Sequence, residues 1–141
     1  MMTAQLKEQL ALPALNTGLL PVSVNGETNS GTMDMSKFHR GMFIVNIAVG
    51  AAGGNIRLQQ TNNADGTSAV NVANGTAIAY TVNNSVYTVE VRGDQLTRRY
   101  IRINLVTDAA TICGITGIGA EPRHQPISDN TSVNTRVASN A

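Results

Sequence analysis

The sequence has no tryptophan, a single cysteine, and only two phenylalanines and three tyrosines among its 141 residues. The lone Cys113 excludes an intramolecular disulfide and a zinc site built from several cysteines. Charged residues make up 13% of the chain, and the formal net charge is +1. Because the basic residues are interspersed with acidic ones, no basic stripe exists to neutralise phosphates, and we expect no nucleic-acid partner.

Long apolar runs are also missing. No window stays apolar for about 18 residues, so we expect no membrane span and no membrane partner. The first residues lack a basic stretch followed by an apolar core, so we expect no secretory signal. The sequence therefore predicts a protein that is synthesised in the cytoplasm.

The chain is rich in neutral polar residues and in the residue types of strands and turns. Threonine, valine and isoleucine fit a pleated surface, and asparagine and glycine fit tight turns. About eight or nine strand-like runs follow one another, with turn signals spaced about 8–12 residues apart. No helix of crossover length separates them, so a parallel α/β sheet is not expected. The fold class predicted is all-β: an antiparallel β-sandwich, jelly-roll-like, with extended N- and C-terminal arms.

The alternation within these runs predicts which side chains form the core. "GMFIVNIAVG" is apolar on both faces, which is typical of a central strand that is partly covered on its outer side. "SGTMDMSKF" alternates like a strand, and "YIRINLV" and "ATICGITGIGA" form two late strands. The residues expected inside the sandwich are Phe43, Val45, Ile47, Leu58, Val89, Val91, Ile101, Ile103 and Leu105.

Both ends of the chain differ from the middle. Residues 1–16 form an N-terminal arm, in which residues 3–12 are expected to make a short amphipathic helix that Pro13 ends. Residues 17–120 form the β-sandwich domain. Residues 121–141 contain two prolines, no alternation and few large apolar groups, so they are expected to be an extended arm that becomes ordered by binding a neighbour. Frayed termini are the simpler alternative.

Candidate catalytic residues are few. Only His39 and His124 would titrate near neutral pH, and neither has a partner at metal-ligand or catalytic spacing. Cys113 lies in an apolar strand, where a buried inert thiol is expected. The carboxylates are scattered singly. We therefore expect no enzyme activity, no catalytic residues, no metal and no cofactor.

An Arg-Gly-Asp triplet stands at Arg92, Gly93 and Asp94. Such a triplet is either an adhesion signal or the bend between two strands. Arg92 closes a predicted strand, and Gly93 is expected to turn the chain for backbone reasons. We interpret the triplet as turn chemistry, because nothing in the sequence supplies the extracellular context that integrin binding needs.

The order of these features resembles the decoration, or cement, proteins of tailed-bacteriophage heads. The resemblance covers about residues 27–126. It lies in a "MDMSKF" segment before an apolar strand, a Gly-rich break before "NIRLQQ", and "VEVRGDQL…RRYIRINL" before a Gly/Ala-rich last strand and a Pro-containing exit. The resemblance implies a β-sandwich that binds the outer surface of the capsid. Its partner would be the major capsid protein, and its own assembly a homotrimer at local three-fold positions.

In this interpretation the two arms clamp adjacent capsid subunits, and the protein is located on the outer surface of the virion. The interface residues predicted are Leu6, Leu10, Arg123, His124, Val133, Arg136 and Val137. One alternative is a receptor- or carbohydrate-binding module of a phage fibre, which would display an exposed aromatic platform. Another is a small hydrolase, which would need a nucleophile and a base that the sequence does not place together.

Overall fold

The fold is built around one long strand, β9 (Tyr100–Pro122), which belongs to both layers of a sandwich. A computed structural model describes residues 12–13, 18–50, 53–72, 77–81 and 84–123. Besides β9, the elements are β1 (Leu12–Pro13), β2 (Leu19–Asn29), β3 (Met33–Asp34), β4 (Phe38–Gly50), β5 (Gly54–Thr61), β6 (Val70–Asn71), β7 (Ile78–Tyr80), β8 (Ser85–Arg92) and the 3-10 turn η1 (Gly93–Gln95). No helix in these ranges is long and apolar enough to cross a membrane.

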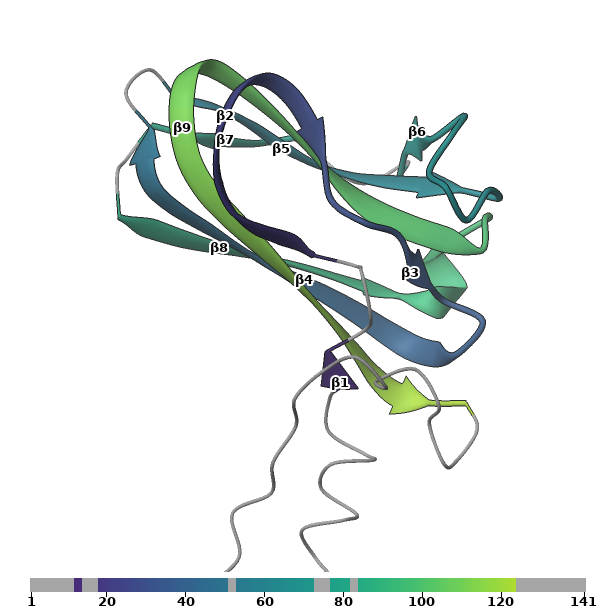
Figure 1. Cartoon of the computed structure of the whole chain (residues 1–141). Helices are drawn as coiled ribbons and strands as arrows, with labels where there is room; N and C mark the ends of the chain where they lie inside the picture. The colour runs from purple at the N-terminus through teal and green to yellow at the C-terminus, as the bar shows by residue number, and fades with distance from the viewer. Residues whose placement is uncertain (1–11, 14–17, 51–52, 73–76, 82–83, 124–141) are drawn as a thin grey trace, which may run out of the picture.

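The pairing of β9 defines the two layers. On one edge its first part pairs with β5 and its later part pairs with β4. On the other edge it pairs in turn with β3, β2 and β1. β6 and β7 extend the β5 layer, and β8 extends the β4 layer. Figure 1 shows β9 and β2 curling together from one layer into the other. Every pairing is antiparallel, which confirms the predicted all-β antiparallel fold.

The bend of β2 and β9 has a local cause at Gly26 and Thr107. Gly26 has φ +94, in the left-handed region that glycine adopts without a steric penalty, and the register of β2 shifts beside it. The Thr107 Oγ1 accepts a hydrogen bond from the Gly26 amide at 2.8 Å and donates to the Gly26 carbonyl at 3.1 Å. The side chain thus satisfies backbone groups that the bulge removes from the strand pairing.

Two predictions about strands were wrong in detail. The runs "YIRINLV" and "ATICGITGIGA" are one strand, because β2 stays paired with β9 on both sides of the bend. The run "SGTMDMSKF" is not one strand: it contains the two-residue strand β3, then a turn, and its last residue, Phe38, begins β4. Asp34 makes that turn, because its carbonyl accepts from the Lys37 amide and its Oδ1 accepts from the Ser36 amide. The alternation nevertheless predicted correctly that Met33 and Met35 are buried.

The core lies between the two layers and contains eight of the nine residues predicted for it. The exception, Val89, is only partly buried, because β8 is the outermost strand of its layer and has a neighbour on one side only. The prediction that "GMFIVNIAVG" is a central strand is confirmed, since β4 lies between β9 and β8. The predicted domain boundary at residue 120 lies inside β9, which continues to Pro122.

Candidate functional site

The outward side of β4 is charged near Arg40 and becomes uncharged toward Ala48. The outward residues of β4 are, in chain order, Arg40, Met42, Ile44, Asn46 and Ala48. Opposite the first four, β8 places Arg92, Glu90, Thr88 and Val86. On its other side, β9 places Ala120, Ile118, Thr116 and Gly114. One end of this outer surface therefore carries ion pairs, and the other carries no charge.

We call the uncharged region the neutral patch; it consists of Leu20, Asn46, Ala48, Val86 and Ile112. Three of its side chains are large, apolar and exposed: Leu20 at 85%, Val86 at 63% and Ile112 at 45%. A groove of about 360 Å³ runs between β2, β9 and β4 through this patch. The described residues that line the groove include no charged side chain. Exposed apolar groups gathered on one face are typical of a protein-binding surface.

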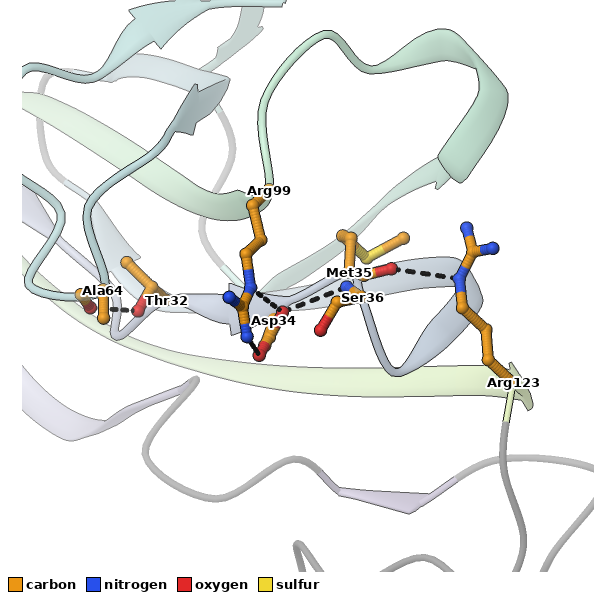
Figure 2. Close-up of polar contacts among 7 residues, drawn as sticks. All are labelled: Thr32, Asp34, Met35, Ser36, Ala64, Arg99 and Arg123. Carbon is orange, nitrogen blue, oxygen red and sulfur yellow. Dashed lines mark hydrogen bonds and ion pairs between the residues drawn. The ribbon is translucent and has the colours of Figure 1, made fainter.

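We call the opposite region the charged end; it consists of residues 34–40, 90–99 and 121–123. Its best-defined contact is a bidentate ion pair between the Arg99 guanidinium and the Asp34 carboxylate, with distances of 2.9 Å from Nε and 2.8 Å from Nη2 (Figure 2). Burial by itself would raise the pKa of Asp34, but hydrogen bonds from Arg99 and Ser36 outweigh it and lower the pKa to about 2. This pair ties β3 to the start of β9.

The connection between β8 and β9 is held by side chains of the other layer. The Gln60 Oε1 of β5 accepts hydrogen bonds from the amides of Thr97 and Arg98 at 2.9 Å and 3.2 Å. The Arg98 Nη1 donates to the carbonyl of Ser68 at 2.9 Å. Gln60 is buried, so its side chain has little freedom to move. These contacts fix the backbone of residues 97–99 relative to β5.

The Arg-Gly-Asp triplet lies where the sequence predicted it. Arg92 is the last residue of β8, and Gly93 begins η1. An exposed ion pair joins Arg92 to Asp94 at 3.3 Å, and the Gln95 Oε1 accepts from the Arg92 amide. The reason given for the glycine was wrong, because Gly93 is not in the left-handed region. A Cβ there would lie 2.9 Å from the Arg123 Nη2, so the glycine leaves room for that guanidinium in the position the structure shows.

Arg123 is the one predicted interface residue that the structure describes. Its Nε donates to the carbonyl of Met35 at 3.3 Å (Figure 2). The same Nε donates to the carbonyl of Phe38 at 3.2 Å, and the Arg123 amide donates to the carbonyl of Lys37. The side chain is thus anchored on the turn before β4. The other predicted interface residues lie outside the described residues, and their assignment stays a prediction: Leu6, Leu10, His124, Val133, Arg136 and Val137.

The candidate catalytic groups are not brought together. Cys113 is 2% exposed and faces the core, where burial raises the pKa of its thiol. His39 lies on β4 at the charged end, next to Arg40 and Glu121 in a shallow groove. Among the described residues, no three His, Cys, Asp or Glu side chains are placed to hold a metal ion.

The aromatic side chains are used by the fold. Phe38, Phe43 and Tyr80 are buried, and Tyr87 packs partly buried against the core. Tyr100 is half-buried and lies under the Arg99 guanidinium, 5.1 Å from ring centroid to Cζ. The five aromatic residues of the chain therefore form no exposed platform.

Comparisons with known proteins bear on the fold. No family model matches the chain, and no curated protein matches it. Among solved structures, the PBSX exported protein XepA is similar with a TM-score of 0.54 at 10% identity, over 92% of this chain and 43% of the XepA chain. This chain thus spans less than half of XepA, and at this identity the likeness shows the fold alone.

Two further structures give weaker matches. PirA is similar at 16% identity with a TM-score of 0.44, over 73% of this chain and 92% of PirA. The coat protein of Tobacco streak virus is similar at 10% identity with a TM-score of 0.41, over 91% of this chain and 96% of the coat protein. Both scores are too low to support an argument about function.

Proposed function

We propose that the chain is a structural virion protein that binds the outer surface of a phage capsid and stabilises it by bridging major capsid protein subunits. The observation that carries the proposal is the neutral patch, which exposes Leu20, Val86 and Ile112 on one layer of a sandwich. The likeness of sequence features to head decoration proteins supports the same function. In this proposal the protein is not an enzyme.

The mechanism is docking of a preformed surface. The patch lies on paired strands, so its backbone does not have to be ordered when a partner binds. Fully burying one leucine, isoleucine or valine contributes roughly 1.5–3 kcal/mol, and the contribution scales with the area that is still exposed. The trimer is the favoured unit. Because each trimer would bind the capsid lattice through several copies of the patch, its overall affinity would exceed that of a single patch.

The competing carbohydrate-binding function is less well supported. A sugar platform needs exposed aromatic rings, and the rings of this chain are buried or engaged. The neutral patch offers aliphatic groups and one amide, Asn46, instead. Aliphatic groups suit a protein surface better than a sugar ring, whose hydroxyls need polar partners.

The test uses the full chain and empty capsids assembled from the major capsid protein of the same genome. We expect the chain to sediment with the capsids at a fixed ratio and to raise their melting temperature. Electron microscopy should then show added density on the outer surface. If the chain stays in the supernatant at concentrations that saturate known decoration proteins, the proposal is wrong.

A further inference from the structure

A second groove, at the charged end, is lined by arginines and differs in chemistry from the neutral patch. It has a volume of about 470 Å³ and lies between the turn before β4, the connection from β8 to β9, and the end of β9. Arg98, Arg99 and Arg123 contribute to its walls, and Leu96, which is partly buried, contributes apolar surface. None of the described residues that line this arginine groove is acidic.

Two of the three arginines are not neutralised by a carboxylate of the described residues. Arg99 is paired with Asp34. Arg98 bonds to the carbonyl of Ser68, and Arg123 bonds to the carbonyls of Met35 and Phe38. A carbonyl group orients a guanidinium without cancelling its charge. The groove therefore holds positive charge that is fixed in position and available to an anion.

The surroundings do not cancel this charge. The charged end contains six basic residues and four acidic ones, a surplus of two positive charges. Three of the acidic residues lie in ion pairs outside the arginine groove: Glu90 and Glu121 with Arg40, and Asp94 with Arg92. The fourth is Asp34, which is paired with Arg99. The arginine groove thus lies in a region whose formal charge is positive.

The positions of the arginines are set before any ligand binds. Gln60 fixes the backbone of Arg98 from the opposite layer, and Gly93 leaves room for the Arg123 guanidinium. Little side-chain freedom remains to be lost on binding, which favours affinity.

We propose that the arginine groove binds an extended segment of a partner protein in which a carboxylate lies next to an apolar side chain. The carboxylate would bond to Arg98 and Arg123, and the apolar side chain would cover Leu96. A peptide suits the groove better than a nucleic acid, because the described residues that line it include no aromatic ring for base stacking and only a short row of cations. This inference goes beyond capsid binding and does not depend on it.

The experiment measures the fluorescence anisotropy of two labelled peptides with the full chain. One peptide alternates glutamate with leucine over five residues, and the other has glutamine in place of each glutamate. We expect the glutamate peptide to bind about tenfold more tightly and to weaken as salt is added. Equal affinity for the two peptides would overturn the proposal.

A matched pair of variants locates the binding. The double variant Arg98→Gln/Arg123→Gln is expected to weaken binding of the glutamate peptide about tenfold. The control Arg57→Gln removes a positive charge from β5, outside the groove, and is expected to change affinity less than twofold. If the control weakens binding as much as the double variant, the peptide is attracted only by the net charge of the protein, and the assignment of the site is wrong.

A measurement on the unmodified chain tests the same site even if the double variant does not fold. Titration with the glutamate peptide should shift the amide NMR signals of Gly93, Thr97 and Arg98 and leave those of Val86 and Ile112 in place. Shifts confined to the neutral patch would contradict the assignment. A short thymidine oligonucleotide serves as competitor, and tighter binding of it than of the glutamate peptide would overturn the choice of a protein partner.

Discussion

The neutral patch and the charged end lie at opposite ends of the same surface, yet they are built differently. Arg40 and Asn46 are six residues apart on β4, a distance of roughly 20 Å along the strand. At the charged end, long-range polar contacts fix the side chains in place. At the neutral patch, strand pairing holds the backbone and leaves apolar groups exposed. Charges that are interspersed in the sequence are thus sorted by the fold.

The two regions also differ in how completely their less exposed polar groups are hydrogen-bonded. The carboxylate of Asp34 accepts hydrogen bonds from Arg99 and Ser36. Near the bend, the hydroxyl of buried Tyr80 has no hydrogen-bond partner. Burial raises the pKa of this hydroxyl; Thr111 is near enough to lower it slightly, but the Thr111 Oγ1 donates to the carbonyl of Ala109. The Asp34 carboxylate is thus fully bonded, whereas the Tyr80 hydroxyl is buried without a partner.

We expect the largest difference in stability between the two regions when two glycines of β9 are replaced by alanine. A Cβ on Gly119 would lie 2.5 Å from the ring of buried Phe38, whereas a Cβ on Gly114 would lie 3.5 Å from Pro21 in ordinary contact. We expect Gly119→Ala to lower the free energy of unfolding by about 2–3 kcal/mol, because the core must shift. Gly114→Ala should change it by less than about 1 kcal/mol. Urea denaturation measures both, and equal effects would contradict the packing described at Phe38.

The next largest loss of stability is expected when the Asp34–Arg99 ion pair is removed. We expect Asp34→Asn to lower the free energy of unfolding by about 1–2 kcal/mol at pH 7, a value reduced for the partial exposure of Arg99. The folded pKa of about 2 lies below the ordinary 3.8, so the pair stabilises the fold above pH 3.8. That stabilisation is lost as the pH falls through about 2.

Denaturation at a series of pH values checks this prediction. The difference between the unmodified chain and Asp34→Asn should narrow between pH 4 and pH 2. Asp94→Asn is the control, because its ion pair with Arg92 is exposed and should contribute less than about 0.5 kcal/mol. A gap that stays constant down to pH 2 would mean that the carboxylate charge of Asp34 does not stabilise the fold.

The smallest change in stability is expected when Tyr80 is replaced by phenylalanine. Because its hydroxyl is buried without a partner, Tyr80→Phe should leave the free energy of unfolding unchanged or raise it by up to about 1 kcal/mol. Thr107→Val provides the contrast at the same bend, since it leaves the Gly26 amide without its partner and should cost about 1–2 kcal/mol. A thermal melt distinguishes the two, and a clear loss in Tyr80→Phe would show that the hydroxyl is bonded after all.

Local pattern was enough to predict the fold class and most of the core. Alternation identifies Phe43, Val45 and Ile47 as inward residues because a strand places every second side chain on one face. The same rule marks Val86 and Ile112 as outward apolar residues. They attracted no notice in the sequence because isolated apolar residues are common on protein surfaces, and only the sheet brings them together.

What the sequence did not predict depends on contacts between distant residues. Asp34 and Arg99 are 65 positions apart, and no local pattern links them. The continuity of β9 through its bend depends on pairing with β2, which the separate runs "YIRINLV" and "ATICGITGIGA" do not reveal. Arg123 was assigned to a neighbour from the character of the tail, and its bonds to Met35 and Phe38 follow only from the return of β9 to the start of β4.

Capsid binding by the neutral patch is tested most directly by co-sedimentation of one variant with empty capsids. The variant Leu20→Ser/Val86→Ser/Ile112→Thr removes the exposed apolar groups and should change the free energy of unfolding by less than about 1.5 kcal/mol, since each surface substitution usually changes it by no more than about 0.5 kcal/mol. The control Val70→Ser removes a valine, 41% exposed, from β6 in the other layer. We predict that the triple variant loses at least about tenfold in capsid affinity while the control binds normally. Normal capsid binding by a folded triple variant would contradict the account.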